Sequence, residues 1–182
     1  MAPPTNHVLV TGGTGFVATH ILDQLVTVRD LKIPSESMYS FIQGGHKITA
    51  TTRDATKAQK LYETFPKYKN TVTFVSVPDF TVPGAFDKVF ESSHFDYVLH
   101  TASPIPFAAS DLQKDIIDPG PLGTNSLLQA AHKFGGKDLK RVVLTSSGVT
   151  LIDPFLPKGE GLDRRYDEED WNTVSITIPR YT

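Results

Sequence analysis

The sequence contains no cysteine. Disulfide bonds, catalysis by a thiol and metal sites built on thiolates are therefore excluded together. Its six histidines are scattered, and none is paired at a four-residue spacing with an acid nearby, as the histidines of a helical zinc site are. We accordingly expect no metal site.

The chain also lacks an excess of charge of one sign. It has 18 Lys and Arg against 20 Asp and Glu, a formal net charge of −2 over 182 residues. There is no long basic stripe, so we expect no nucleic-acid partner. No apolar run approaches the roughly 18 residues of a membrane span, and the N-terminus lacks the basic start and apolar stretch of a secretory signal. We expect no membrane association and a cytoplasmic location.

What the sequence does contain is an alternation of short apolar runs and helical patterns. This alternation is typical of a doubly wound α/β fold with a parallel sheet, the Rossmann fold. Right-handed crossovers predict the strand order 3-2-1-4-5, with a ligand crevice at the carboxyl ends of strands 1 and 4. We expect one dinucleotide-binding domain over residues 1–172. The expected strands are residues 8–11, 47–51, 72–76, 97–101 and 141–146; the expected helices are residues 16–26, 55–64, 83–91 and from about 111 or 121 to 134.

Two segments depart from this pattern. Residues 27–43 separate the first helix from the second strand, where a βαβ unit needs only about 2 to 6 connecting residues, and we interpret them as an insertion. Residues 173–182 form an irregular tail after the acidic run 167–170.

A second interpretation of these two segments is that they are translated introns. Valine codons begin with GT and a glutamine codon can be CAG, so a segment from near Val26 or Val28 to Gln43 fits a retained short intron. A similar read-through after Asn172 would produce the tail. Transcript sequencing that finds both segments uninterrupted in the mature message would refute this hypothesis.

A glycine turn follows the first apolar run, in Val-Leu-Val-Thr-Gly-Gly-Thr-Gly-Phe-Val-Ala at residues 8–18. Gly12 permits a tight turn, Gly15 lets the backbone approach a phosphate, and Ala18 lets the helix lie close to the sheet. Free N–H groups at the helix start favour a negative charge. The spacing alone is a weak signal, but its place between a buried strand and an amphipathic helix predicts a dinucleotide site.

Basic residues follow the second expected strand. Arg53 comes two residues after the end of that strand, and Lys57 and Lys60 lie one and two turns along the next helix. An Arg at this position pairs with a 2′-phosphate, whereas an acid accepts hydrogen bonds from the ribose hydroxyls. The three basic residues favour NADP over NAD, while Asp54 would either cap the helix or compete for the ribose.

Polar residues also follow the later strands. Asp79, after the third strand, fits an acceptor for the adenine amino group, and the fourth strand runs into small residues over 101–103. We interpret His100 as a strand-end histidine rather than a catalyst. Ser146 and Ser147 place hydroxyl groups at the end of the fifth strand.

Five motifs in order resemble the extended short-chain dehydrogenase/reductase family, within the NAD-dependent epimerase/dehydratase superfamily. They are Val-Thr-Gly-Gly-Thr-Gly-Phe, Thr-Thr-Arg-Asp, Leu-His-Thr-Ala-Ser-Pro, Asp-Pro-Gly-Pro-Leu-Gly-Thr and Arg-Val-Val-Leu-Thr-Ser-Ser. The sequence is most similar to the branch of dihydroflavonol reductases, cinnamoyl-CoA reductases and fungal ketone or methylglyoxal reductases. The resemblance covers residues 7–26 and 44–172.

The resemblance implies a role for each matching residue. The pyrophosphate turn would be formed by Gly12, Thr14, Gly15, Phe16 and Val17. The 2′-phosphate contacts would come from Arg53 and Lys60, and the adenine pocket from Asp79 and Phe80. The nicotinamide half would be lined by Thr101, Ala102 and Ser103, and Ser147 would be the catalytic serine that hydrogen-bonds the substrate carbonyl.

The sequence departs from the family pattern at the proton donor. Members of the family carry Tyr-x-x-x-Lys on a helix some 30 to 40 residues beyond the serine, by the resemblance. None of the six tyrosines here has a lysine four residues on. The sixth strand and the substrate-binding lobe are also missing.

The resemblance therefore implies an NADP-dependent oxidoreductase that reduces an aldehyde or ketone, or oxidises the alcohol, of a small or secondary metabolite. One alternative is a catalytically impaired nucleotide-binding remnant, because general acid catalysis typically contributes about 10² to 10⁴-fold. Another is a lyase or isomerase on the same scaffold, since fold does not fix function. The open sheet edge after the fifth strand predicts self-association.

Overall fold

The computed structural model describes residues 6–27, 46–103, 108–152 and 165–172. The chain divides into two compact units, Met1–Leu144 and Thr145–Thr182. The expected insertion lies outside the described residues except for Thr27, and the expected tail lies outside them entirely.

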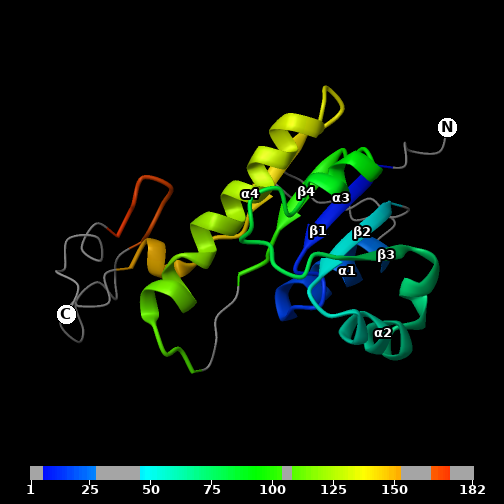
Figure 1. Ribbon diagram of the computed structural model, residues 1–182, viewed down its shortest axis with the longest axis horizontal. Helices are drawn as coiled ribbons and strands as arrows, with labels where there is room; N and C mark the ends of the chain where they lie inside the picture. Colours follow the sequence, from blue (N-terminus) through cyan, green and yellow to red (C-terminus); the bar gives the residue numbers. More distant parts are fainter. Residues whose placement is uncertain (1–5, 28–45, 104–107, 153–164, 173–182) are drawn as a thin grey trace. The chain divides into compact units, whose positions relative to one another are not determined.

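The first unit contains a five-stranded sheet whose hydrogen-bonded neighbours are all parallel, in the order β3-β2-β1-β4-β5 (Figure 1). This order and the doubly wound α/β class confirm the prediction. The strands are β1 (His7–Thr11), β2 (Lys47–Thr52), β3 (Val72–Ser76), β4 (Tyr97–His100) and β5 (Arg141–Leu144). β5 ends two residues earlier than expected.

The apolar run of β1 lies at the centre of this sheet. Val8, Leu9 and Val10 are each at most 2% exposed, as expected for a parallel strand covered on both faces. Because successive side chains of a strand point to opposite faces, Leu9 belongs to one hydrophobic cluster and Val8 and Val10 to another. The two clusters are the cores on the two sides of the sheet.

Helices cover both faces. The first unit has α1 (Phe16–Thr27), α2 (Ala55–Thr64), the 3-10 helix η2 (Pro66–Asn70), α3 (Asp87–Ser92), the π-helix η3 (Gln113–Ile117) and α4 (Pro119–Phe134). Leu22 and Leu25 of α1 and Tyr68 of η2 lie in the cluster with Val8. Phe90 of α3 and Leu127 of α4 lie in the cluster with Leu9.

The helix expected over residues 83–91 begins only at Asp87. Residues 83 and 84 are Pro-Gly, and Gly84 has a φ of 75°, in the left-handed region that ends a helical path. The pattern of apolar residues alone does not predict this turn. The long helix before the fifth strand begins at Pro119, after the single π-turn of η3.

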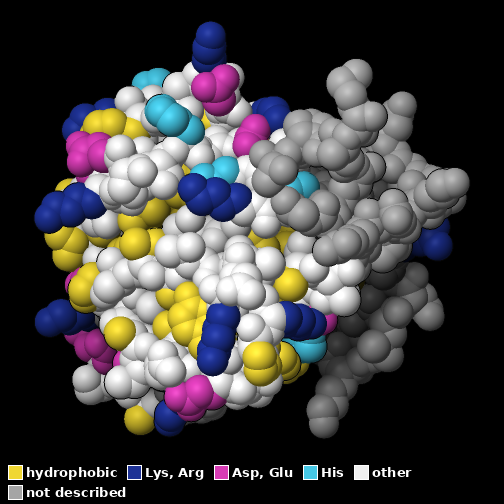
Figure 2. All heavy atoms as spheres, turned by 90° about the vertical axis from the view of Figure 1, so that its right-hand side faces the viewer, with side chains coloured by type: hydrophobic (Ala, Val, Ile, Leu, Met, Phe, Trp, Pro, Cys, Tyr) yellow, Lys and Arg dark blue, Asp and Glu magenta, His cyan; other side chains and the backbone are white. Residues whose placement is uncertain are grey.

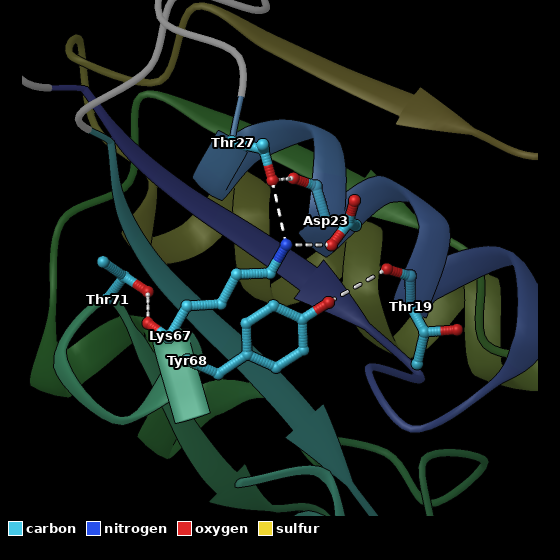
Figure 3. A network of polar contacts seen from close by, with 6 residues as sticks. All are labelled: Thr19, Asp23, Thr27, Lys67, Tyr68 and Thr71. Carbon is cyan, nitrogen blue, oxygen red and sulfur yellow. Dashed lines mark hydrogen bonds and ion pairs between the residues drawn. The ribbon is translucent and has the colours of Figure 1, made fainter. Parts of the chain in front are cut away.

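An ion pair and hydrogen bonds connect η2 to α1 (Figure 3). The Lys67 ammonium forms an ion pair with Asp23 and donates to Thr27 Oγ1 at 3.0 Å. The adjacent Tyr68 hydroxyl donates to the carbonyl oxygen of Thr19 at 3.3 Å. The ring of Tyr68 is fully buried, so its one polar atom reaches a backbone acceptor instead of water.

The second unit contains a 3-10 helix, η4 (Gly148–Thr150). Asn172 closes it: the side-chain amide donates to the carbonyl oxygens of Val149 at 3.0 Å and Ile152 at 2.9 Å, and its backbone N–H donates to Thr150 at 2.7 Å.

Basic and acidic side chains are interspersed over the face drawn in Figure 2, which is the right-hand side of Figure 1. This distribution agrees with the near balance of charges in the sequence. Among the helices of the described residues, none combines the length and hydropathy needed to cross a bilayer.

Candidate cofactor site

A cavity of about 550 Å³ opens at the carboxyl end of the sheet in the first unit. Four segments line it: the glycine turn after β1, the β2–α2 junction, the segment after β3 and the segment after β4. Ligand crevices of open α/β sheets lie at this end of the strands, where the strand order reverses between β1 and β4. The lining residues are Gly12, Thr14, Gly15, Thr51, Thr52, Arg53, Asp54, Lys57, Val77, Pro78, Phe80, Thr101, Ala102 and Ser103.

The glycine turn is held against both neighbouring strands. Gly12 has a φ of 66°, and a Cβ there would lie 2.9 Å from the Ala102 Cα. The N–H of Gly13 donates to the Thr51 carbonyl at 2.7 Å, and a Cβ on Gly13 would lie 2.6 Å from the Ala50 Cβ. Side chains at these two positions would displace the backbone that shapes the cavity.

Gly13 was not among the sequence-predicted site residues. The motif Gly-x-x-Gly-x-x-Ala assigns roles to positions 12, 15 and 18 and treats position 13 as variable. The second glycine of the Gly-Gly pair was the available signal, because two consecutive glycines in a turn often mark a close approach to another backbone.

The start of α1 fits an anion. The first N–H groups of a helix have no acceptor within the helix, and the helix dipole favours negative charge there. Phe16 and Val17 begin α1, but their side chains are 81% and 49% exposed and do not line the cavity. Their predicted contribution to a pyrophosphate site therefore rests on backbone N–H groups.

Positive charge lines the cavity where β2 meets α2. Arg53 and Lys57 contribute to the lining, whereas Lys60, assigned by the family resemblance, does not. Both lysines lie on α2, and only one turn of helix separates the position that lines the cavity from the one that does not. A 2′-phosphate at this end of the cavity would meet Arg53 and Lys57.

Asp54 is the N-cap of α2. Its Oδ1 accepts the N–H of Thr56 at 2.8 Å and the hydroxyl of the same residue at 2.5 Å. These two hydrogen bonds hold the pKa of the Asp54 carboxyl below its ordinary value. The structure shows the helix-capping role that the sequence left open; Asp54 also lines the cavity, and its contact with a ribose stays a prediction.

The two residues of the predicted adenine pocket, Phe80 and Asp79, both follow β3 but line different cavities. Phe80 is 6% exposed, lines the cavity and lies so close to Gly123 of α4 that a Cβ there would meet its ring at 1.8 Å. Asp79 instead lines a separate hollow beside β3 and α3. Its Oδ1 accepts the N–H and the hydroxyl of Thr81 at 2.9 and 2.6 Å, and these bonds lower the pKa of Asp79. The predicted adenine contact of Asp79 is thus placed at a turn outside the cavity lining.

The segment after β4 forms another wall and is tied to the end of β1. The Thr101 hydroxyl donates to the Thr11 carbonyl at 2.6 Å. The N–H groups of Thr101 and Ala102 both donate to Thr11 Oγ1, each at 3.2 Å. Thr101, Ala102 and Ser103 all line the cavity. Their contact with the nicotinamide half stays a prediction.

Ser147, the predicted catalytic serine, belongs to the second unit. It is the N-cap of η4, and its Oγ accepts the N–H of Val149 at 3.5 Å. The side chain is exposed. Its catalytic role stays a prediction.

The geometry of the first unit fits a dinucleotide. Bare backbone at Gly12 and at Gly15, the residue just before α1, lines one cavity together with the cations Arg53 and Lys57. These are the groups that neutralise a pyrophosphate and a ribose phosphate.

Comparison with known proteins agrees with this geometry. The model of the NAD dependent epimerase/dehydratase family matches residues 8–164. Ketoreductase azaE of Aspergillus niger is 35% identical over 180 residues, which are 96% of this chain and 47% of that protein. The NADPH-dependent methylglyoxal reductase GRE2 of Saccharomyces cerevisiae is 33% identical over 173 residues, which are 92% of this chain and 44% of the yeast protein.

A solved structure of one of these relatives is also similar to this chain. The crystal structure of yeast methylglyoxal/isovaleraldehyde reductase Gre2 complexed with NADPH superposes with a TM-score of 0.74 at 31% identity, over 92% of this chain and 44% of that one. The chain thus spans a little under half the length of these relatives. The match over most of the chain confirms the family predicted from the five motifs: this chain belongs to the NAD dependent epimerase/dehydratase family.

Proposed function

We propose that this protein is an NADP-dependent oxidoreductase that reduces an aldehyde or ketone, or oxidises the corresponding alcohol. The observation that carries the proposal is the cavity in which the glycine turn, Arg53 and Lys57 meet. Relatives described as a ketoreductase and as an NADPH-dependent methylglyoxal reductase support the reaction class.

The chain's own residues would hold the cofactor as follows. The first N–H groups of α1 would hold the pyrophosphate, and Arg53 and Lys57 would pair with the 2′-phosphate, which NAD lacks. Thr101, Ala102 and Ser103 would line the nicotinamide half. When bound, NADPH supplies a hydride for a carbonyl carbon.

Ser147 is the proposed partner of the substrate. Its hydroxyl would donate a hydrogen bond to the carbonyl oxygen and so stabilise the negative charge that develops there. A small-molecule carbonyl compound is the proposed substrate class.

A second candidate function is nucleotide binding without turnover. It applies if these 182 residues act alone, because none of their six tyrosines is followed by a lysine at the fourth position. Without a tyrosine whose pKa a lysine lowers, proton donation to the alkoxide loses about 10² to 10⁴-fold in rate.

The two candidates are separated by a titration followed by an assay. The chain is first titrated with NADPH, and NADPH oxidation is then followed on a panel of aldehydes and ketones. Binding with turnover that Ser147→Ala abolishes supports the reductase. Binding without turnover supports the second candidate, and product formation without net cofactor consumption would contradict both in favour of lyase or isomerase chemistry.

The cytoplasmic location expected from the sequence stays a prediction. Fractionation of cells that express the full chain tests it, because a location in a membrane or organelle fraction would contradict it.

A further inference from the structure

His100 is a buried titratable residue that the proposed reaction does not use. It ends β4, is 5% exposed, and lies one residue before the wall formed by Thr101, Ala102 and Ser103. Its Nδ1 lies 2.7 Å from Thr11 Oγ1, and its Nε2 lies 3.5 Å from Thr124 Oγ1 on α4. The imidazole therefore sits between the end of β1 and the helix that covers β4.

The contacts of Thr11 fix the tautomer of this imidazole. A threonine hydroxyl has one hydrogen to donate and two lone pairs that accept. Both lone pairs of Thr11 Oγ1 are taken by the N–H groups of Thr101 and Ala102. The hydroxyl must then donate its hydrogen to His100 Nδ1, so Nδ1 is unprotonated, Nε2 carries the hydrogen, and Nε2–H points to Thr124.

The same contacts connect His100 to the cavity wall. With its hydrogen directed at Nδ1, Thr11 Oγ1 presents its lone pairs to the two backbone N–H groups. Those N–H groups set the path of the backbone that passes within 2.9 Å of a Cβ built on Gly12. The orientation of one hydroxyl thereby fixes how the segment after β4 abuts the glycine turn.

We infer that His100 is a positioning residue for cofactor binding: as the neutral Nε2–H tautomer it orients the Thr11 hydroxyl, which in turn holds the Thr101–Ala102 backbone against the glycine turn. The inference rests on the proposed NADP(H) site. It assigns His100 no contact with the cofactor and no part in the chemical step.

Protonation would break this arrangement. An imidazolium carries a hydrogen on both nitrogens, so Nδ1–H would compete with the two backbone N–H groups for the two lone pairs of Thr11. One of the N–H groups would lose its acceptor. Among the described residues, the neighbours of His100 offer no compensating charge, since Thr11 and Leu144 beside it in the sheet, Thr124 on α4 and the Phe80 ring 6.4 Å away are all uncharged. Burial also lowers the pKa of His100, which keeps the neutral form at neutral pH.

Two substitutions test the inference. His100→Asn offers a carbonyl oxygen close to the position of Nδ1 and cannot titrate, whereas His100→Leu fills similar space without an acceptor. We expect His100→Asn to bind NADPH at pH 7.5 within about threefold of the wild type and His100→Leu to bind at least tenfold more weakly. Hydrogen exchange of the Thr101 and Ala102 amides in the cofactor-free chain should be slow in the wild type and in His100→Asn, and faster in His100→Leu.

The pH profile separates positioning from a direct charge contact. The 2′-phosphate has a second pKa of about 6, but its titration affects NADPH binding equally in all variants. We therefore compare the wild type with His100→Asn between pH 7.5 and 5. The wild type should lose affinity for NADPH relative to His100→Asn as the pH falls. If His100 instead contacted a phosphate as a cation, the wild type would gain affinity relative to His100→Asn.

His7 provides the matched control. It is also a partly buried histidine bonded to a threonine, with Nε2 2.9 Å from Thr49 Oγ1, but it begins β1 at the opposite end of the sheet from the cavity. His7→Asn should leave the pH profile of NADPH binding unchanged.

The outcomes distinguish this inference from the proposed function. Failure of the wild type to bind NADPH contradicts the proposed function, and amide exchange in the cofactor-free chain still tests the role of His100. The inference is overturned if His100→Leu leaves the two amides as protected as in the wild type, or if His100→Asn binds as weakly as His100→Leu.

Discussion

At the scale of single residues, Lys57 and Lys60 differ in whether they line the cavity, and this difference bears on the choice between NADPH and NADH. Both project from α2, but Lys57 lines the cavity and Lys60 does not. Replacing Lys57 by Ala should raise the Kd for NADPH about tenfold, which corresponds to about 1.4 kcal/mol, and leave the Kd for NADH unchanged because NADH has no 2′-phosphate. Isothermal titration of both cofactors measures this.

Lys60→Ala is the matched control, since it removes the same charge three residues further along the same helix. It should change the Kd for NADPH by less than about twofold, in keeping with the small effect of screened surface charges. Equal losses from the two variants, or an equal loss of NADH affinity in Lys57→Ala, would refute the assignment.

Tyr68 gives a prediction about alkaline stability. Burial, and secondarily the charge of Asp23, raise the pKa of Tyr68 to about 12, whereas an exposed tyrosine ionises at about 10. The contribution of Tyr68 to the free energy of unfolding is thus complete below pH 10 and is lost as the pH rises toward 12, because the unfolded state releases its proton first.

Tyr68→Phe tests this sign. At pH 8 it should lower the free energy of unfolding by about 1 kcal/mol, the usual value of one hydrogen bond, because the bond to Thr19 is lost. In urea denaturation at pH 11 the deficit should shrink or reverse. A deficit that is the same at both pH values would contradict the account.

At the scale of elements, two glycines of α4 differ in what surrounds them. A Cβ on Gly123 would meet the Phe80 ring at 1.8 Å, whereas a Cβ on Gly120 would meet nothing within 4 Å. Gly123→Ala should therefore cost about 1 to 3 kcal/mol of stability through overpacking and weaken NADPH binding, because Phe80 lines the cavity. Thermal unfolding and cofactor titration measure the two effects.

Gly120→Ala should leave binding unchanged and stability unchanged or higher by up to about 1 kcal/mol, because alanine is the better helix former. If the two variants behave alike, the close approach of α4 to Phe80 does not support the cavity.

Much of the element order was predictable, because buried parallel strands leave uninterrupted apolar runs such as 8–10. The start of α3 was not, because the Pro83-Gly84 turn overrides a helical pattern. The periodicity of the sequence placed Lys57 and Lys60 on one helix. It could not show which of the two lines the cavity, because that depends on how α2 packs against the sheet. The capping role of Asp54 likewise depends on where the helix begins.

At the scale of the whole molecule, β5 lies at one edge of the sheet among the strands that the structure describes. Leu144 on that strand is 44% exposed, and an apolar edge strand favours pairing with another chain. We expect the protein to self-associate with rising concentration and Leu144→Lys to weaken the association. Sedimentation velocity over a concentration series measures it.

Leu112→Lys is the control, because Leu112 is more exposed, at 67%, but lies off the strand. A monomer at every concentration, or equal effects of the two substitutions, would contradict association through the β5 edge.

The glycine turn, Arg53 and Lys57 form the proposed NADP(H) site. The decisive measurement is equilibrium titration of the full chain with NADPH and, in parallel, with NADH at pH 7.5 and low salt. We expect saturable binding of NADPH at one site per chain, at least tenfold tighter than that of NADH. Equal affinity for the two cofactors, or no saturable binding of either, would refute the proposed site.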